Sequence, residues 1–379
     1  MSVLCGCVSP IALDKAVIEY DKTTANLVSK QLLLNIARAH QQQPIHFTGV
    51  SNIAATFNFQ LNAGATPALT GNNGALLAPL FGGSIAENPT ITIVPIEGEE
   101  FTRRLLTPIY ESKLTMLLRQ GTDVDLILRL LAAELRLSEK HTEVYANNPG
   151  DMAGYSLFRQ AVLHLSAIQD QGQLYAEPMI FETTLELPAE SVGPEQLANL
   201  QKDYEIEYSS ERKSVKLVKN QIGRIVITNY DPASLTNQDR KRLHDEANER
   251  ADNDVLVDIR SGFEGGEWPL HGVFRLRSFH NVLNFIGQSL DRSKEFPVQK
   301  HFKTPAVREN PDSSLGIMVT AWEPEDSELS VRHNGQYYWL KPETGYQWNR
   351  EGFRLLYQVF QMTVSELGTK GAPVITIAK

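Results

Sequence analysis

The chain has 379 residues, of which 42% are hydrophobic and 21% charged, so it is long enough for one large domain or two to three ordinary ones and is not mostly disordered. Its net charge of −9 argues against a nucleic-acid partner, because nucleic-acid-binding proteins usually carry a basic face. No run of about 20 apolar residues is present, so the sequence predicts no transmembrane helix.

The two cysteines, Cys5 and Cys7, both lie within the first seven residues. A zinc site usually needs four ligands, and no other cysteine is available to complete one. A functionless N-terminus is the plain alternative. The third interpretation is that Leu4-Cys5-Gly6-Cys7 resembles a bacterial lipobox, in which Cys7 would carry the lipid. The basic and apolar segments of such a signal do not precede Leu4, which implies a start codon further upstream or a trimmed signal.

Residues 11–41 are predicted to form one long helix that ends before Pro44. Leu13, Val17 and Leu27 belong to an apolar stripe with spacings of three, four and seven residues, which is typical of an amphipathic helix. We interpret this stripe as a face that packs against a core.

A long β-hairpin is predicted next, with strands at about 45–66 and 79–96 and a Gly/Pro/Asn-rich tip. Apolar and polar uncharged residues alternate with a period of two, which indicates strands. Pro89 and Pro95 suggest a sheet edge or a bulge. The apolar positions that we assign to a membrane or oligomer interface are Ile53, Phe57, Phe59, Leu61, Ile85, Ile91 and Ile93.

Charge is absent from Gln41 to Ala86, where there is no Asp, Glu, Lys or Arg. A strand on a soluble surface normally carries charges, which also protect exposed edges. Charge avoidance is expected in hydrocarbon, where a lipid-facing charge costs roughly 2–4 kcal/mol. Two strands leave open edges, and open sheet edges do not occur in the hydrocarbon of a membrane. Each of several identical subunits would therefore have to contribute its hairpin to a closed ring. A hairpin in a soluble sheet or at a subunit contact is the alternative, as is a mobile loop.

The middle of the chain predicts helices at 98–106, 110–137 and 152–170, and strands follow at about 175–187, 214–220 and 223–230. The last third predicts a charged helix at 239–250, a strand with VLVDIR, a helix at 277–290, a strand with GIMVTAW, a hairpin turning at Asn334-Gly335, a long helix and a closing strand at 372–379. These elements make an α+β fold. Residues 1–10 would be a truncated signal with its anchor, 11–172 a helical region with the hairpin 45–96 inserted, and 173–379 an α+β C-terminal region.

No catalytic signature stands out, since GxSxG, HExxH and GxxxxGK[ST] are all missing. The glycine-rich stretch 262–267 is interpreted as a tight turn. His40 and His46 flank the first strand, but they supply only two metal ligands. The basic residues between 271 and 280 are interpreted as exposed side chains at the start of a helix. The alternative is that they form a binding site for an anion. We therefore predict no cofactor, no metal and no enzymatic activity.

Two segments carry a family resemblance, namely QLLLNIARAHQQQPIHFTGVSNIAATFNF at 31–59 and AENPTITIVPIEGEEFTRRLLTPI at 86–109. They resemble a family of proteobacterial outer-membrane lipoproteins that has no assigned activity. The resemblance implies a lipidated Cys7 and an outer-membrane address, and it implies no substrate or catalytic residue.

We therefore expect a lipid-anchored envelope protein on the periplasmic side of the outer membrane. It would oligomerise through its hairpin and serve a structural or transport role, as a channel or an accessory of an envelope complex. The alternatives are a soluble periplasmic module that docks partners on the hairpin edge, and an enzyme whose site is assembled from dispersed residues.

Overall fold

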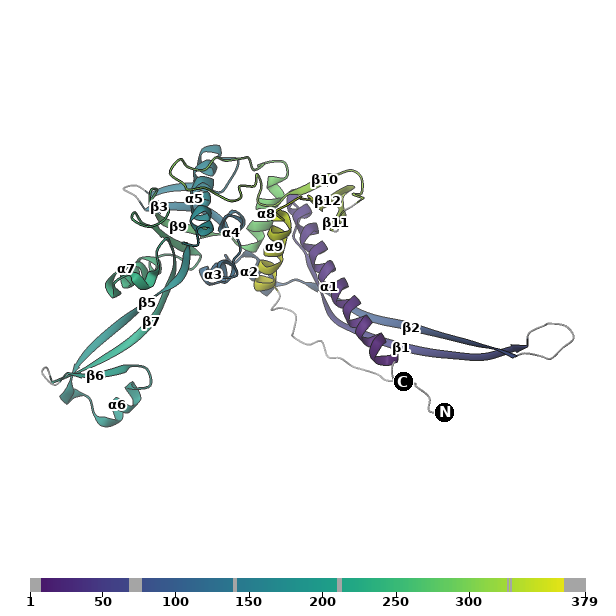
Figure 1. Cartoon of the computed structure of the whole chain (residues 1–379), viewed down its shortest axis with the longest axis horizontal. Coiled ribbons are helices and arrows are strands. Elements are labelled where there is room, and N and C mark those ends of the chain that lie inside the picture. Colours follow the sequence, from purple (N-terminus) through teal and green to yellow (C-terminus); the bar gives the residue numbers. More distant parts are fainter. Residues whose placement is uncertain are drawn as a thin grey trace. The chain divides into compact units, whose positions relative to one another are not determined.

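The computed structural model describes residues 8–67, 77–138, 142–209, 213–325, 327 and 329–364. It has the predicted α+β architecture, with a long N-terminal helix, an extended hairpin, a helical middle segment and a mixed C-terminal region (Figure 1). The chain divides into two compact units. Of the described residues, the first unit holds 8–31, 46–67 and 77–101, and the second holds the remainder.

Helix α1 (Val8–His40) confirms the predicted N-terminal helix. The stripe does not form a core face along the first half of this helix, where Val17 and Ile18 are 55% and 60% exposed. Burial begins in the second unit, between Leu32 and Ala39. There α8 approaches so closely that a Cβ added to Gly287 would lie 2.6 Å from the backbone nitrogen of His40.

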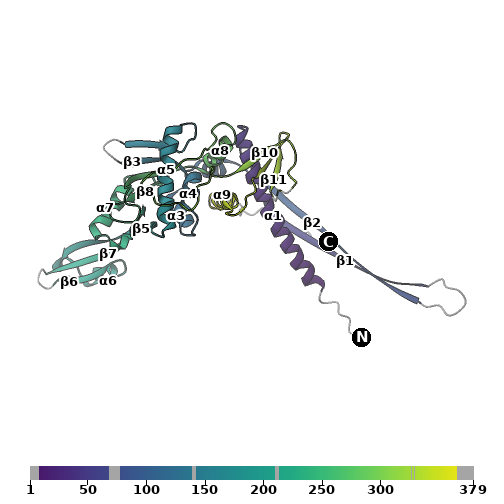
Figure 2. The same ribbon diagram turned by 45° about the horizontal axis from the view of Figure 1, so that its top comes forward.

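The predicted hairpin is confirmed as the antiparallel pair β1 (Phe47–Pro67) and β2 (Leu77–Ile96). Both views show the two strands as a long ribbon (Figure 2). The register runs from Phe47 opposite Ile96 to Pro67 opposite Leu77, with one irregularity in β1 between Val50 and Asn52. Most of the predicted tip, 68–76, lies outside the described residues.

The helical middle segment differs from the prediction after α2 (Glu99–Leu106). The expected helix 110–137 consists of α3 (Glu111–Leu118), α4 (Val124–Leu131) and the strand β3 (Ala132–Ser138). The break falls at Gly121, whose φ of 77° suits glycine, and Asp123 then caps α4. The helix-favouring residues of β3 become a strand because pairing with β9 outweighs local propensity.

A seven-stranded sheet forms the centre of the second unit. Its order is β4-β3-β9-β8-β7-β5, with β6 also pairing with β7, and all pairs are antiparallel except β7 with β8. The strands are β4 (Thr142–Ala146), β5 (Tyr175–Pro188), β6 (Glu205–Ser209), β7 (Ser214–Thr228), β8 (Asp254–Ile259) and β9 (Leu270–Leu276). The predicted strands 214–220 and 223–230 are therefore one strand, and β4, β6 and β9 were not predicted.

Helices pack on this sheet and bury its apolar side chains. They include α5 (Met152–Asp170), which has the predicted bounds, and α7 (Asn237–Asn248). The charged α7 buries only Leu243 and Ala247, which join Met179, Val226, Leu256 and Val273 in a core cluster. The long strands β5 and β7 continue past α7, and their far end carries β6 together with α6 (Pro194–Leu200) (Figure 1). Short 3-10 turns lie at Ala189–Ser191 and Pro232–Ser234.

The C-terminal part adds α8 (Phe279–Ser289), a small sheet and α9 (Trp348–Val364). The sheet has the order β10-β12-β11, from β10 (Ile317–Thr320), β11 (Ser330–His333) and β12 (Gln336–Leu340). Asn334 and Gly335 both have positive φ, as the predicted type I′ turn requires. The predicted closing strand lies outside the described residues. The segment 290–316 between α8 and β10 has no regular secondary structure.

Candidate functional site

The hairpin of the first unit is the candidate site, and its register gives the ribbon two different faces. Ile53 lies opposite Ile91 and Phe59 opposite Ile85, whereas Asn52 lies opposite Thr92. Residues directly opposite each other share one face of a sheet. One face of the ribbon therefore collects apolar positions and the other collects polar uncharged ones.

The predicted interface residues are only partly brought together. Phe57 lies opposite Glu87, the one charged residue of the two strands, and Leu61 lies opposite Gly83. Ile93 lies opposite Val50, before the irregularity in β1, and its side chain is 61% exposed. The predicted lipidation residue Cys7 lies outside the described residues.

Gln31 fixes the base of the hairpin to α1. Its side-chain Oε1 accepts from the N–H of Thr48 at 2.9 Å, and its Nε2 donates to the C=O of Thr48 at 3.0 Å. The amide therefore occupies the outer edge of β1 at this residue, as a neighbouring strand would. Sequence analysis missed Gln31, because a single polar residue on a helix gives no signal of a partner 17 residues away.

A second polar cluster lies on the seven-stranded sheet, around Asp258. Asp258 Oδ1 is 2.8 Å from His271 Nδ1, directly across the β8–β9 pair, and Glu246 Oε1 of α7 is 2.8 Å from the other ring nitrogen. Asp258 Oδ2 accepts from Tyr230 at 2.5 Å and from Arg260 at 2.6 Å. These contacts satisfy the carboxylate and the imidazole within the cluster, so it acts as a clasp between α7, β8 and β9.

Electrostatics in the clasp favour a charged His271. The hydrogen bond to Asp258 raises the pKa of His271, which burial opposes and Glu246 supports. Burial alone would raise the pKa of Asp258, but hydrogen bonds from His271 and Tyr230 and the charge of Arg260 outweigh it and lower that pKa. The expected exposed helix start is therefore wrong for His271.

A buried charge network anchors the irregular segment 290–316. Glu295 accepts from Arg129 at 2.9 Å, from Tyr155 at 2.8 Å, and from the backbone and hydroxyl of Ser314 at 2.6 and 2.8 Å. Burial alone would raise the pKa of Glu295, but Arg129 and the Ser314 donors outweigh it and lower it. Arg129 also donates to the C=O of Pro311. Beside it, Arg159 is paired with Asp125 in the same interior.

Arg277 contradicts the expectation of exposed basic residues, because it is buried. Its guanidinium donates to the carbonyl groups of Arg129, Leu130 and Asn147 at 2.6–3.3 Å and lies over the ring of Phe285. Burial lowers the pKa of Arg277 to about 9. The side chain joins the end of α4 to Asn147, the residue after β4, and is not a site for an external anion.

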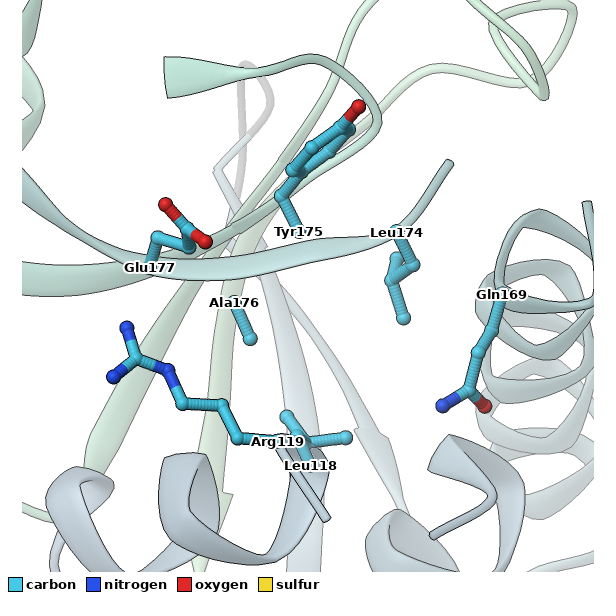
Figure 3. A pocket seen from close by; sticks show the side chains of 7 residues that line it. All are labelled: Leu118, Arg119, Gln169, Leu174, Tyr175, Ala176 and Glu177. Carbon is cyan, nitrogen blue, oxygen red and sulfur yellow. The ribbon is translucent and has the colours of Figure 1, made fainter. Parts of the chain in front are cut away.

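A hollow of about 160 Å³ lies where α3 and α5 end beside the start of β5 (Figure 3). Arg119 and Glu177 lie on one side of it, and Gln169 lies on the other. The side chain of Gln169 is already bonded to Val124 and Thr122. Ligand pockets usually measure about 300–1,000 Å³, so this hollow is too small for most of them.

His40 and His46 flank the first strand, and the described residues hold no group of three or more His, Cys, Asp or Glu side chains placed for a metal. His40 instead contacts Tyr338 and Asp291, each at 2.9 Å. Among the helices that the structure describes, none combines the length and apolar character that a membrane crossing requires.

Comparisons of the chain with protein-family models, with curated proteins and with solved structures give no significant match.

Proposed function

We propose that the protein is a lipid-anchored bacterial envelope protein that assembles with copies of itself through the hairpin. Its role would be structural or in transport, as a channel or an accessory subunit of an envelope complex, and not catalytic. The anchor would be Cys7, on the strength of the lipobox-like Leu4-Cys5-Gly6-Cys7 in the sequence.

One observation carries the assembly part of this proposal, namely the length of a ribbon that has one charged residue, Glu87, and no third strand in the described part of the chain. β1 and β2 have 21 and 20 residues, so the ribbon is about 65 Å long at about 3.3 Å per residue. In the described part of the chain, the two strands pair only with each other. An isolated two-stranded hairpin is marginally stable in water, so a ribbon of this length is expected to find further partners.

The first half of α1 supports the same proposal. Val17, Ile18 and Leu27 are all exposed, although they belong to a helix of the same unit. These exposed residues of the helix, together with Ile93 of the ribbon, would be covered if several copies packed together.

The test is cell fractionation of the full chain, expressed with a complete lipoprotein signal joined in front of Leu4. Three variants run beside the wild type: Cys7→Ser, the matched control Cys5→Ser, and a deletion of 45–96. We expect the wild type and Cys5→Ser in the outer-membrane fraction as oligomers after extraction with detergent. Cys7→Ser should leave the membrane fraction, and the deletion should give a folded monomer.

Other outcomes separate the parts of the proposal. If Cys7→Ser fractionates like Cys5→Ser, the lipid anchor is refuted. If the deletion variant keeps the size of the wild type, assembly through the hairpin is refuted. A wild-type monomer in the soluble periplasmic fraction would favour a binding module that docks partners on the hairpin.

A further inference from the structure

The three prolines of β2 are separated by even numbers of residues, so they have the same orientation along the strand. Pro79, Pro89 and Pro95 are odd-numbered, and the register of β2 is regular because the only irregularity lies in β1. Along a regular strand, successive residues direct their peptide groups alternately to the two neighbouring strands. The three missing N–H groups therefore point to the same edge of β2.

Gln31 shows which edge this is. Thr48 lies opposite Pro95, and both peptide groups of Thr48 are bonded to Gln31, away from β2. Thr48 and Pro95 are therefore a pair without mutual hydrogen bonds, in which both residues face outward. It follows that all three prolines interrupt the outer edge of β2, and that none of them removes a bond to β1.

The outer edge of β1 has the opposite character. After the irregularity, odd residues of β1 lie opposite odd residues of β2, as in Ile53 opposite Ile91, so they also face outward. From Ile53 to Ala65 these positions contain no proline and no charge. At the base of the ribbon this edge is occupied by Gln31. The ribbon thus has one edge that can accept a strand and one that is interrupted.

We infer that the outer edge of β1, from Ile53 to Ala65, pairs antiparallel with the same edge of a second copy of this chain. The product is a four-stranded sheet of order β2-β1-β1-β2, closed on both sides by the proline-interrupted edges. This inference rests on the proposed assembly through the hairpin and defines its geometry.

The outer edge of β1 is better suited to pair with a second copy of itself than with the outer edge of β2. A two-fold axis at Phe59 places Phe57 opposite Leu61 of the second copy and Ile53 opposite Ala65, which uses the whole open edge. Odd residues lie opposite odd residues in this pairing, so the apolar faces of the two ribbons become continuous. Because β1 carries no charge, pairing with itself brings no like charges together. A ring would instead pair β1 with the interrupted edge of β2, which lacks donors at three positions.

Matched proline variants of the full detergent-extracted chain test this inference. Phe59 and Ile85 lie opposite each other, on the same face of the ribbon, and the peptide groups of both point away from the partner strand. Phe59→Pro therefore removes one N–H from the outer edge of β1, and Ile85→Pro removes one from the outer edge of β2. The mass of each assembly is measured by light scattering during size-exclusion chromatography. We expect a dimer for the wild type and for Ile85→Pro, and a shift to monomer for Phe59→Pro.

Cross-linking provides a measurement that does not depend on how the prolines are tolerated. In a background with Cys5→Ser and Cys7→Ser, a single cysteine at 59 should lie about 5.5 Å from its copy, and one at 85 about 14 Å away across three strand spacings. A short thiol cross-linker should join two chains through Phe59→Cys and not through Ile85→Cys.

The outcomes distinguish this geometry from assembly itself. A larger assembly that both prolines disrupt, with no cross-link at 59, would overturn pairing through β1 alone and leave assembly through the hairpin intact. An oligomer insensitive to both prolines and to deletion of 45–96 would overturn both proposals.

Discussion

The side-chain amide of Gln31 bonds both peptide groups of Thr48, at 2.9 and 3.0 Å, so that a helix residue takes the place of a strand at the base of β1. Pro95, across the ribbon from Thr48, needs no donor there. The base of the ribbon is therefore closed on the β1 side by a side chain and on the β2 side by a proline, while β1 contains no proline from Ile53 to Ala65.

Replacing Gln31 should loosen this base. Gln31→Ala removes two hydrogen bonds, each with a net contribution of about 0.5–1.5 kcal/mol, so local opening should become easier by about 1–3 kcal/mol. Hydrogen exchange at the amide of Thr48 should accelerate accordingly. Lys30→Ala, at the exposed neighbouring residue, is the matched control and should leave exchange at Thr48 unchanged. Equal protection of Thr48 in both variants would mean that the contact does not hold the strand.

Glu295 should be one of the most sensitive residues of the second unit. Its side chain is 1% exposed and it receives four hydrogen bonds, from Arg129, Tyr155 and Ser314. Glu295→Ala leaves the guanidinium of Arg129 buried without this partner, which typically costs about 3–5 kcal/mol.

Denaturant unfolding measures this loss. Asp312→Ala, in the same irregular segment but exposed, is the control and should change the free energy of unfolding by less than about 0.5 kcal/mol. A similarly small effect of Glu295→Ala would show that the segment 290–316 is held by other contacts.

Local patterns sufficed to predict the elements that local forces determine. The alternation from 45 to 96 specified the hairpin almost to its ends, and Asn334-Gly335 specified a turn, because only a few residue types tolerate positive φ at both positions. The bounds of α5 followed from its apolar spacing.

The remaining features depend on partners far away in the sequence. Ala132-Ala133-Glu134-Leu135 reads as helix, and only the pairing of β3 with β9 makes it a strand. Glu295 and Arg129 are 166 residues apart, so neither position signals the other. The sequence shows that Pro79, Pro89 and Pro95 are all odd-numbered. Only the structure shows that the peptide groups of the odd-numbered residues of β2 point away from β1.

The clasp around His271 predicts a pH dependence of stability. Two carboxylates, Asp258 and Glu246, each need a proton donor from the ring, so both nitrogens must carry hydrogen. The folded pKa of His271 is raised above the ordinary value of about 6.5. The stabilisation is therefore fully present below about pH 6.5 and is lost as the pH rises through the raised pKa.

Unfolding curves between pH 5.5 and 9 measure this effect in the wild type and in His271→Gln. The wild type should have the larger free energy of unfolding at low pH, and the difference between the two proteins should become small at the high end of this range. His280→Gln is the control, because burial lowers the pKa of His280 and its loss should not produce the same slope. A constant difference between wild type and His271→Gln would mean that folding does not change the pKa of His271.

Asp123 predicts a loss of stability in the same direction, but at lower pH. It caps α4 by accepting from the N–H of Asp125 at 2.8 Å, and burial, followed by the charge of Asp125, raises its pKa to about 6. Because the folded state holds this proton more tightly than the unfolded chain does, stability falls as the pH rises from about 4 through 6.

Asparagine caps a helix about as well as aspartate and carries no charge. Asp123→Asn should therefore be more stable than the wild type above pH 6 and close to it at pH 4, whereas Asp123→Ala loses the cap and should be less stable by about 1 kcal/mol at pH 4. Asp151→Asn is the matched control at the exposed cap of α5 and should show no gain that grows with pH. If Asp123→Asn follows the pH profile of the wild type, folding does not change the pKa of Asp123, and the charge of its carboxylate imposes no cost on the fold.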